Sequence, residues 1–214
     1  MRAHAPGIGA ALVFRYACYA IMLALALWNE RERAPTLPDA VLARLPYVPW
    51  IDRANYVAWL VVYLPVSLAL LASEPARWIR YMVTGGLVSL ARGVCIVLTT
   101  LGPPDPAHAG PGIGERGFGQ AYLELLSPVG VFAHGSARAY MTQDLFFSGH
   151  VATTFLLVLY AWQQPRLRVL ALAGHVLTIA SVFLAHLHYS IDVLGAWAVT
   201  FALFALREWE PRVA

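Results

Sequence analysis

Six long stretches of apolar residues constrain the fold of this 214-residue chain more than any other feature. About 20 apolar residues in helical form cross the hydrocarbon core of a bilayer. A helix also satisfies its own backbone polar groups where no water is present. The composition agrees, because 59% of the residues are hydrophobic and 13% are charged, whereas a soluble domain has about 25% charged residues. The expected spans are about 8–28, 56–72, 81–101, 145–162, 167–186 and 189–206.

The sequence therefore predicts an all-α integral membrane bundle of six transmembrane helices, with residues 1–214 forming a single transmembrane catalytic domain. We expect no appended soluble domain. All 15 basic residues are arginines, and they are spread along the chain rather than gathered in a block. This distribution is typical of membrane flanks and not of a nucleic-acid surface. The expected partners are membrane lipids as substrates, with no nucleic acid, and the oligomeric state is left open.

The arginines outside the spans also indicate an orientation. Seven of them fall on one side of the predicted bundle: Arg2, Arg77, Arg80, Arg166, Arg168, Arg207 and Arg212. Six fall on the other side: Arg31, Arg33, Arg44, Arg53, Arg116 and Arg138. The positive-inside rule then places both termini in the cytoplasm and the opposite loops on the exoplasmic or periplasmic face.

Polar residues with catalytic potential are concentrated in two segments, 144–150 and 186–192, that the predicted topology brings to one membrane face. His188 and Asp192 are four apart, so on a helix they would share a face, and the carboxylate could orient the imidazole for nucleophilic attack. His150 could then protonate a leaving group. Ser148 and Gly149 offer a hydroxyl and backbone N–H groups at a helix N-terminus, which suits a phosphate. Together these residues predict phosphoryl transfer through a phosphohistidine.

Two other kinds of site stay open at this point. His186, His188 and Asp192 have spacing that a metal could use, but no further ligand supports it, so we expect neither metal nor cofactor. A transporter that relays protons through the same residues is the other alternative.

The spans also contain Arg92, Arg15 and His175. Arg92 is a candidate phosphate clamp or, equally, a structural partner for a buried acid. Arg15 is expected to be structural or to snorkel toward the interface. His175 is expected to pack between helices or to form an interhelical hydrogen bond.

The two polar segments resemble a known family. Ser148-Gly149-His150, together with His188 and Asp192, resembles the signature of the phosphatidic acid phosphatase type 2 superfamily. Within it, residues 144–150 are similar to the C-G-D-x-L-F-S-G-H motif of sphingomyelin synthases, and residues 184–193 to their A-H-x-H-Y-T-x-D-V segment. Weaker similarities are residues 36–39, which resemble a P-L-P-D element, and residues 92–103, which resemble an R-x-x-C...T-T-L-P segment.

The resemblance implies six spans, no metal, and transfer of a phosphorylated head group from a glycerophospholipid to a lipid alcohol. His188 would be the nucleophile, Asp192 its orienting partner and His150 the general acid. The candidate substrate-binding residues are Arg92, Asp144, Ser148, Gly149 and Tyr189.

The alternative within the superfamily is a lipid phosphate phosphatase or phospholipase C-like hydrolase with the same site. The phosphatases carry an arginine six residues before the nucleophile, where this chain has Val182. Thr142 and Gln143 also replace the C-G pair of the synthases, and Ser190 replaces their threonine.

Overall fold

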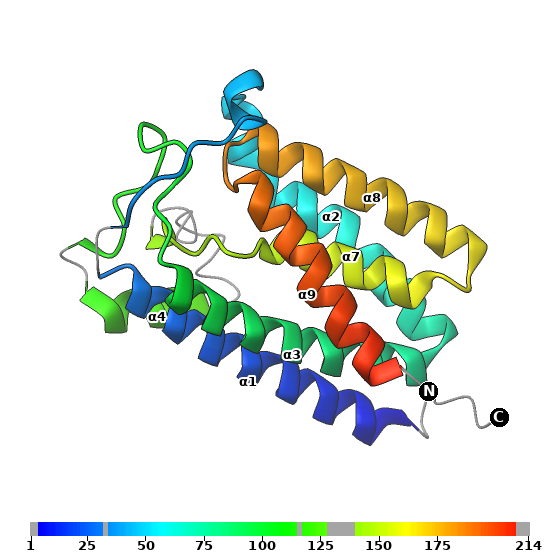
Figure 1. Cartoon of the computed structure of the whole chain (residues 1–214). Helices are drawn as coiled ribbons and strands as arrows, with labels where there is room; N and C mark the ends of the chain where they lie inside the picture. The colour runs from blue at the N-terminus through cyan, green and yellow to red at the C-terminus, as the bar shows by residue number, and fades with distance from the viewer. Residues whose placement is uncertain (1–3, 32–33, 115–116, 128–139, 209–214) are drawn as a thin grey trace.

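The computed structural model describes residues 4–31, 34–114, 117–127 and 140–208. These ranges contain seven α-helices and no β-strand, so the expected all-α fold is confirmed (Figure 1). The helices are α1 (Ala5–Asn29), α2 (Pro49–Ser73), α3 (Pro75–Thr99), α4 (Gly117–Leu126), α7 (Gly149–Ala161), α8 (Pro165–Leu184) and α9 (Ser190–Glu208), with one 3-10 turn, η2 (Leu42–Arg44).

Five helices in the described ranges, α1, α2, α3, α8 and α9, are long and apolar enough to cross a membrane. The protein is therefore a multi-pass membrane protein. The sixth apolar stretch forms α7, whose 13 residues rise only about 20 Å. Because Val151, Leu156 and Ala161 on α7 are almost completely buried, this short helix forms the centre of the bundle.

The predicted span 145–162 was wrong at its start, because residues 145–148 are not helical. Hydrogen bonds to residues of α3 and α9 hold their backbone instead. The Phe147 carbonyl accepts a hydrogen bond from Arg92 Nε (2.7 Å), and the Ser148 N–H donates to the Asp192 carbonyl (3.2 Å). The helix begins only at Gly149, where the Ser148 hydroxyl caps it by accepting from the Val151 N–H.

Other predicted boundaries were also displaced. Helices α2, α3 and α8 begin at Pro49, Pro75 and Pro165, earlier than expected. Proline favours the first turn of a helix, because its fixed φ suits the helix and its missing N–H would be unpaired there. The long segment between the third and fourth predicted spans contains the amphipathic helix α4.

The helices pack so that the two polar segments meet at one end of the bundle. Helices α1 and α3 lie side by side, and α7 packs between α8, α9 and α3 (Figure 1). The start of α1 and the end of α9 both lie at the opposite end of the bundle (Figure 1). The predicted proximity of residues 144–150 and 186–192 is thus confirmed by the bond from Ser148 to Asp192. Of the arginines used for orientation, Arg2, Arg33, Arg116, Arg138 and Arg212 lie outside the described residues.

His175, on α8, forms hydrogen bonds to α7 and α9. Its Nε2 accepts from the indole N–H of Trp197 on α9 (2.9 Å), so its Nδ1 carries the proton. That proton is shared with Thr154 Oγ1 on α7 (2.9 Å). The expected interhelical hydrogen bond is therefore confirmed.

Candidate active site

The chain reverses between α8 and α9 in a way that presents His188. Helix α8 ends with the Leu187 N–H donating to the Val182 carbonyl and the His186 N–H to the Phe183 carbonyl, both at 3.0 Å. This is a Schellman motif, and His186 occupies its left-handed position with φ 49°. The reversal leaves His188 in the short link before α9 begins at Ser190.

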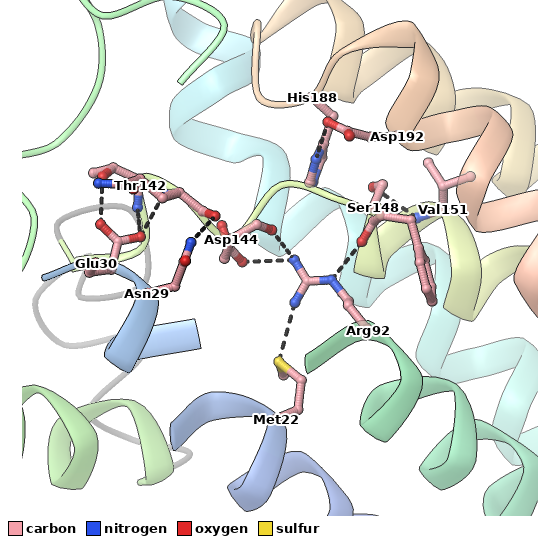
Figure 2. Close-up of polar contacts among 12 residues, drawn as sticks. Met22, Asn29, Glu30, Arg92, Thr142, Asp144, Ser148, Val151, His188 and Asp192 are labelled. Carbon is pink, nitrogen blue, oxygen red and sulfur yellow. Dashed lines mark hydrogen bonds and ion pairs between the residues drawn. The ribbon is translucent and has the colours of Figure 1, made fainter. Parts of the chain in front are cut away.

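His188 and Asp192 do pair, although not for the predicted reason. His188 precedes helix α9, so the two residues do not share a helical face. Instead the Asp192 carboxylate reaches back over the helix start, where its Oδ2 accepts from the Tyr189 N–H (2.9 Å) and lies 3.3 Å from His188 Nδ1. Both side chains are buried, at 5% and 0% exposed. With Nδ1 turned to the carboxylate, Nε2 of His188 is the nitrogen left for chemistry (Figure 2).

Asp39, in the segment similar to the P-L-P-D element, holds the start of α9 from outside. Its Oδ2 accepts from the Ser190 N–H (2.6 Å), and its Oδ1 accepts from the N–H groups of Val41 and Leu42. Burial alone would raise the pKa of Asp39, but these hydrogen bonds outweigh it and hold the pKa below its ordinary range. The neighbouring Leu37 N–H donates to the Tyr189 hydroxyl (3.0 Å). The link that carries His188 is thus fastened to a segment about 150 residues earlier in the chain.

We expect Asp39→Ala to slow turnover while leaving substrate affinity nearly unchanged, because it loosens the link that carries His188. The lost cap should also lower the free energy of unfolding by about 1–2 kcal/mol. Asp39→Asn keeps an acceptor oxygen for the Ser190 N–H and should restore most of kcat. A rise in KM with unchanged kcat would show that Asp39 does not act through His188.

Arg92 fixes the other polar segment. Its guanidinium pairs with the Asp144 carboxylate (Nη2 to Oδ2, 2.8 Å) and also donates to the carbonyls of Asp144 and Phe147 (Figure 2). A Cβ on residue 149 would lie 3.2 Å from Arg92 Nε, so glycine at this position lets the guanidinium lie against the backbone. The contacts seen are those of a structural partner for an acid. The role of Arg92 as a phosphate clamp stays a prediction.

Glu30, at the end of α1, holds the residues that precede Asp144. Its carboxylate accepts from the N–H groups of Thr142 and Gln143 and from the Thr142 hydroxyl (Figure 2). The adjacent Asn29 donates from Nδ2 to the Gln143 carbonyl (3.2 Å). Threonine and glutamine, which replace the C-G pair of the synthases, are therefore both engaged in this anchor. Burial of the Glu30 carboxyl raises its pKa to about 7, although the three hydrogen bonds oppose the rise.

The raised pKa of Glu30 predicts a pH dependence of stability. A carboxyl whose folded pKa exceeds its unfolded value contributes stability below the unfolded pKa, and that stability is lost as pH rises through about 7. We expect Glu30→Gln to remove this component, because the amide oxygen still accepts from both N–H groups and the NH₂ can donate to the Thr142 hydroxyl. Melting temperatures of both proteins between pH 5 and pH 8 measure it. Parallel curves for the two proteins would contradict the assignment.

The two histidines face one cavity of about 340 Å³, within the size range of small-molecule sites. It is lined by residues of α1, α2, α3, α4, α7 and the segments 103–110, 141–145 and 185–188. His150 meets the rings of Trp59 (centroids 5.1 Å apart) and Tyr56 (6.2 Å) edge-on. Aromatic packing, rather than a carboxylate, therefore sets the orientation of His150.

The predicted site residues divide into two groups. His150, His188, Arg92, Asp144 and Gly149 all line the cavity. Asp192, Ser148 and Tyr189 lie behind it, where Asp192 orients His188, Ser148 caps α7, and Tyr189 donates to the Gly102 carbonyl (2.9 Å). A contact of Ser148 or Tyr189 with substrate stays a prediction, while the structure gives both a positioning contact.

Asp105, which also lines the cavity, was not singled out by sequence reasoning. Asp105 accepts from His108 Nδ1 (2.8 Å) and lies 3.3 Å from His186 Nδ1, while His186 Nε2 faces the Leu45 carbonyl (3.2 Å). Burial would raise the pKa of Asp105, but the two histidines outweigh it and lower the pKa. His186 is thus turned to Asp105 and not to His188. Within the described ranges, no three His, Cys, Asp or Glu side chains are grouped as a metal would require.

The fold brings two histidines to one cavity of a helical membrane bundle. Residues 142–209, which include both histidines, match the family model described as PAP2 superfamily C-terminal. The resemblance inferred from the motifs is therefore confirmed over this segment.

Curated relatives refine this similarity. The chain is 29% identical over 166 residues to phosphatidylethanolamine:ceramide ethanolaminephosphotransferase of Trypanosoma brucei brucei, covering 73% of this chain and 48% of that protein. It is 24% identical over 203 residues to sphingomyelin synthase-related protein 1 of Mus musculus, covering 90% of this chain and 42% of that protein. The chain spans about half the length of the curated relatives it matches. The similarity to sphingomyelin synthase-like proteins is thus confirmed.

Proposed function

We propose that the protein is an integral-membrane lipid phosphotransferase. It moves a phosphorylated head group, of the phosphocholine or phosphoethanolamine type, from a glycerophospholipid to a ceramide- or diacylglycerol-like alcohol. One observation carries the proposal: a buried His188, backed by Asp192, shares a cavity with His150 at one end of a membrane bundle. The two relatives, an ethanolaminephosphotransferase and a sphingomyelin synthase-related protein, support the same chemical class.

The first half-reaction forms a phosphohistidine. His188 Nε2 attacks the phosphorus, and the bond from phosphorus to the diacylglycerol oxygen breaks. Protonated His150 gives its proton to that oxygen, so diacylglycerol leaves as a neutral alcohol. Asp192 holds Nδ1–H of His188 and offsets the positive charge that develops on the ring.

The second half-reaction regenerates both histidines. Neutral His150 removes the proton of the acceptor hydroxyl as its oxygen attacks phosphorus, and the bond from phosphorus to His188 breaks. The N–H groups of Gly149 and His150 at the start of α7 lie where they can stabilise the phosphoryl oxygens. The product is a phospholipid with the transferred head group, and the enzyme returns to its starting protonation state.

Val182 supports transfer over hydrolysis of a phosphate monoester. It stands where superfamily phosphatases carry an arginine, and its side chain is completely buried in the core. A terminal phosphate carries more negative charge than a phosphodiester, so a site without that arginine suits a diester head group better. We propose further that the termini are cytoplasmic and that the cavity opens on the exoplasmic or periplasmic face, as the arginine distribution favours.

Product analysis tests the proposal. Purified protein is incubated with a head-group-labelled glycerophospholipid, with and without ceramide or a diacylglycerol of different chain length. We expect label in a new phospholipid only when an acceptor is present. Label released as a soluble phosphomonoester without acceptor would identify a hydrolase instead. Label that stays in the donor under all conditions, with lipid movement retained in histidine variants, would identify a transporter.

A further inference from the structure

The cavity extends from the two histidines toward the middle of helices α1 and α3. On α3 it is lined by Arg92 and Ser89, and on α1 by Met22, Tyr19 and Arg15. Residues three and four apart share a helix face, so each helix presents a continuous wall. Met22 and Arg15 are seven positions apart, which corresponds to about 10 Å along the helix axis. The inner end of the cavity therefore lies deeper in the membrane than the catalytic residues.

Arg15 forms this inner end, and its guanidinium points inward rather than snorkelling to the interface. It lies directly against the α3 backbone at Gly85, where an added Cβ would collide with Nη1. Gly85 thus provides the space that the guanidinium occupies. A permanently charged group at this depth is costly unless it has a function.

Two hydrogen-bond donors on residues that line the cavity, one at its inner end and one beside His150, have no acceptor among the described residues. They are Arg15 Nη1 and the indole Nε1 of Trp59, both buried atoms on residues that line the cavity. The other cavity cation, Arg92, is already neutralised by Asp144, whereas no described acid pairs with Arg15. Buried donors are normally satisfied, so the cavity is built for a ligand that supplies acceptor oxygens.

We propose that Arg15 and Trp59 form a binding site for the carbonyl oxygens of a lipid substrate, ester or amide. The inference rests on the proposed function, which brings the phosphorus of the lipid to His188. The acyl carbonyls follow the phosphate within a few bonds, toward the membrane interior. They are strong hydrogen-bond acceptors that carry no charge. The site would select acylated lipids over ether lipids, which lack these carbonyls.

The test measures binding rather than turnover, in a His188→Ala background so that no substrate is consumed. Protein in detergent micelles is given equal amounts of diacyl- and dialkyl-phosphatidylethanolamine, and native mass spectrometry reads the bound ratio. A second arm compares diacylglycerol with dialkylglycerol and shows whether donor or acceptor supplies the carbonyl. A hydrogen bond to a charged group predicts a diacyl preference of about tenfold or more in one arm.

Two variants isolate Arg15. Arg15→Met removes the charge, and Gly85→Ala displaces the flexible end of Arg15 while leaving the helix intact; both should bring the ratio close to one. Gly9→Ala is the matched control, because an added Cβ there meets nothing within 4 Å, and should keep the preference. The inference is overturned if protein with Arg15 and Gly85 both intact shows no diacyl preference in either arm. It is also overturned if Gly85→Ala keeps the diacyl preference while Arg15→Met merely unfolds the protein.

The outcomes separate this inference from the proposed function. A preference that depends on Arg15, in a protein that transfers no head group, would support the carbonyl site and reject the transferase. Head-group transfer without the diacyl preference would support the transferase and reject the carbonyl site.

Discussion

His188→Ala is expected to lower head-group transfer about a thousandfold or more, because it removes the atom that would carry the transferred group. Binding of the phospholipid should change little, since His188 is one of many residues that line the cavity. Transfer of a labelled head group to ceramide, measured at saturating lipid, gives the ratio of kcat values. Retention of transfer in this variant would reject His188 as nucleophile.

Two companion variants show whether the effect belongs to this histidine and its carboxylate. Asp192→Asn leaves the buried shape intact but favours the wrong tautomer of His188, so we expect a loss of about a hundredfold or more. His186→Asn changes a neighbouring histidine that faces Asp105 and Leu45, and asparagine tolerates its left-handed conformation. This variant should keep most of the transfer. An equal loss in His186→Asn would indicate general disturbance of the link.

Arg92→Met is expected to be the most destabilising single substitution at the site. It leaves the Asp144 carboxylate without its cation and the Phe147 carbonyl without its donor. The Arg92 side chain is only 8% exposed, so water cannot easily replace these contacts. Breaking a buried ion pair from one side costs about 3–5 kcal/mol. Unfolding in detergent with increasing denaturant measures the loss. Arg80→Met removes a pair with Glu208 in which the arginine is 52% exposed, and should cost about 1 kcal/mol or less.

A double substitution separates the ion pair from the backbone contacts of Arg92. If the unpaired Asp144 charge causes most of the loss, Arg92→Met with Asp144→Asn should be more stable than Arg92→Met alone. If instead the carbonyl contacts dominate, the second substitution should add to the loss. A stability of Arg92→Met close to that of the unsubstituted protein would contradict the role assigned to the guanidinium.

The membrane helices and the meeting of the two polar segments could be predicted because their signals are local. Apolar stretches of helical length identified all five long helices, and the order of charges and motifs brought His150 and His188 to one end. The pairing of His188 with Asp192 was also predicted, but from a shared helical face that does not exist. The real cause is the start of α9 at Ser190, which a four-residue spacing cannot reveal.

The supports of the site could not be predicted, because they join distant parts of the chain. Glu30 bonds Thr142 across 112 residues, and Asp39 bonds Ser190 across 151. Neither contact has a periodic pattern in the sequence, although the similarity of residues 36–39 to a family element pointed to Asp39 without explaining it. Arg15 was expected to be structural or to snorkel, and only the packing of α1 on Gly85 shows its inward direction.

A single-turnover experiment without acceptor tests the central claim, a covalent intermediate on His188, most directly. Protein in excess is mixed with head-group-labelled donor, quenched under alkaline conditions that preserve phosphohistidine, and digested for peptide mass spectrometry. The account predicts stoichiometric diacylglycerol release, label on the peptide that contains His188, and loss of that label to a new phospholipid when ceramide is added. Diacylglycerol release that requires ceramide and never labels the peptide would contradict it.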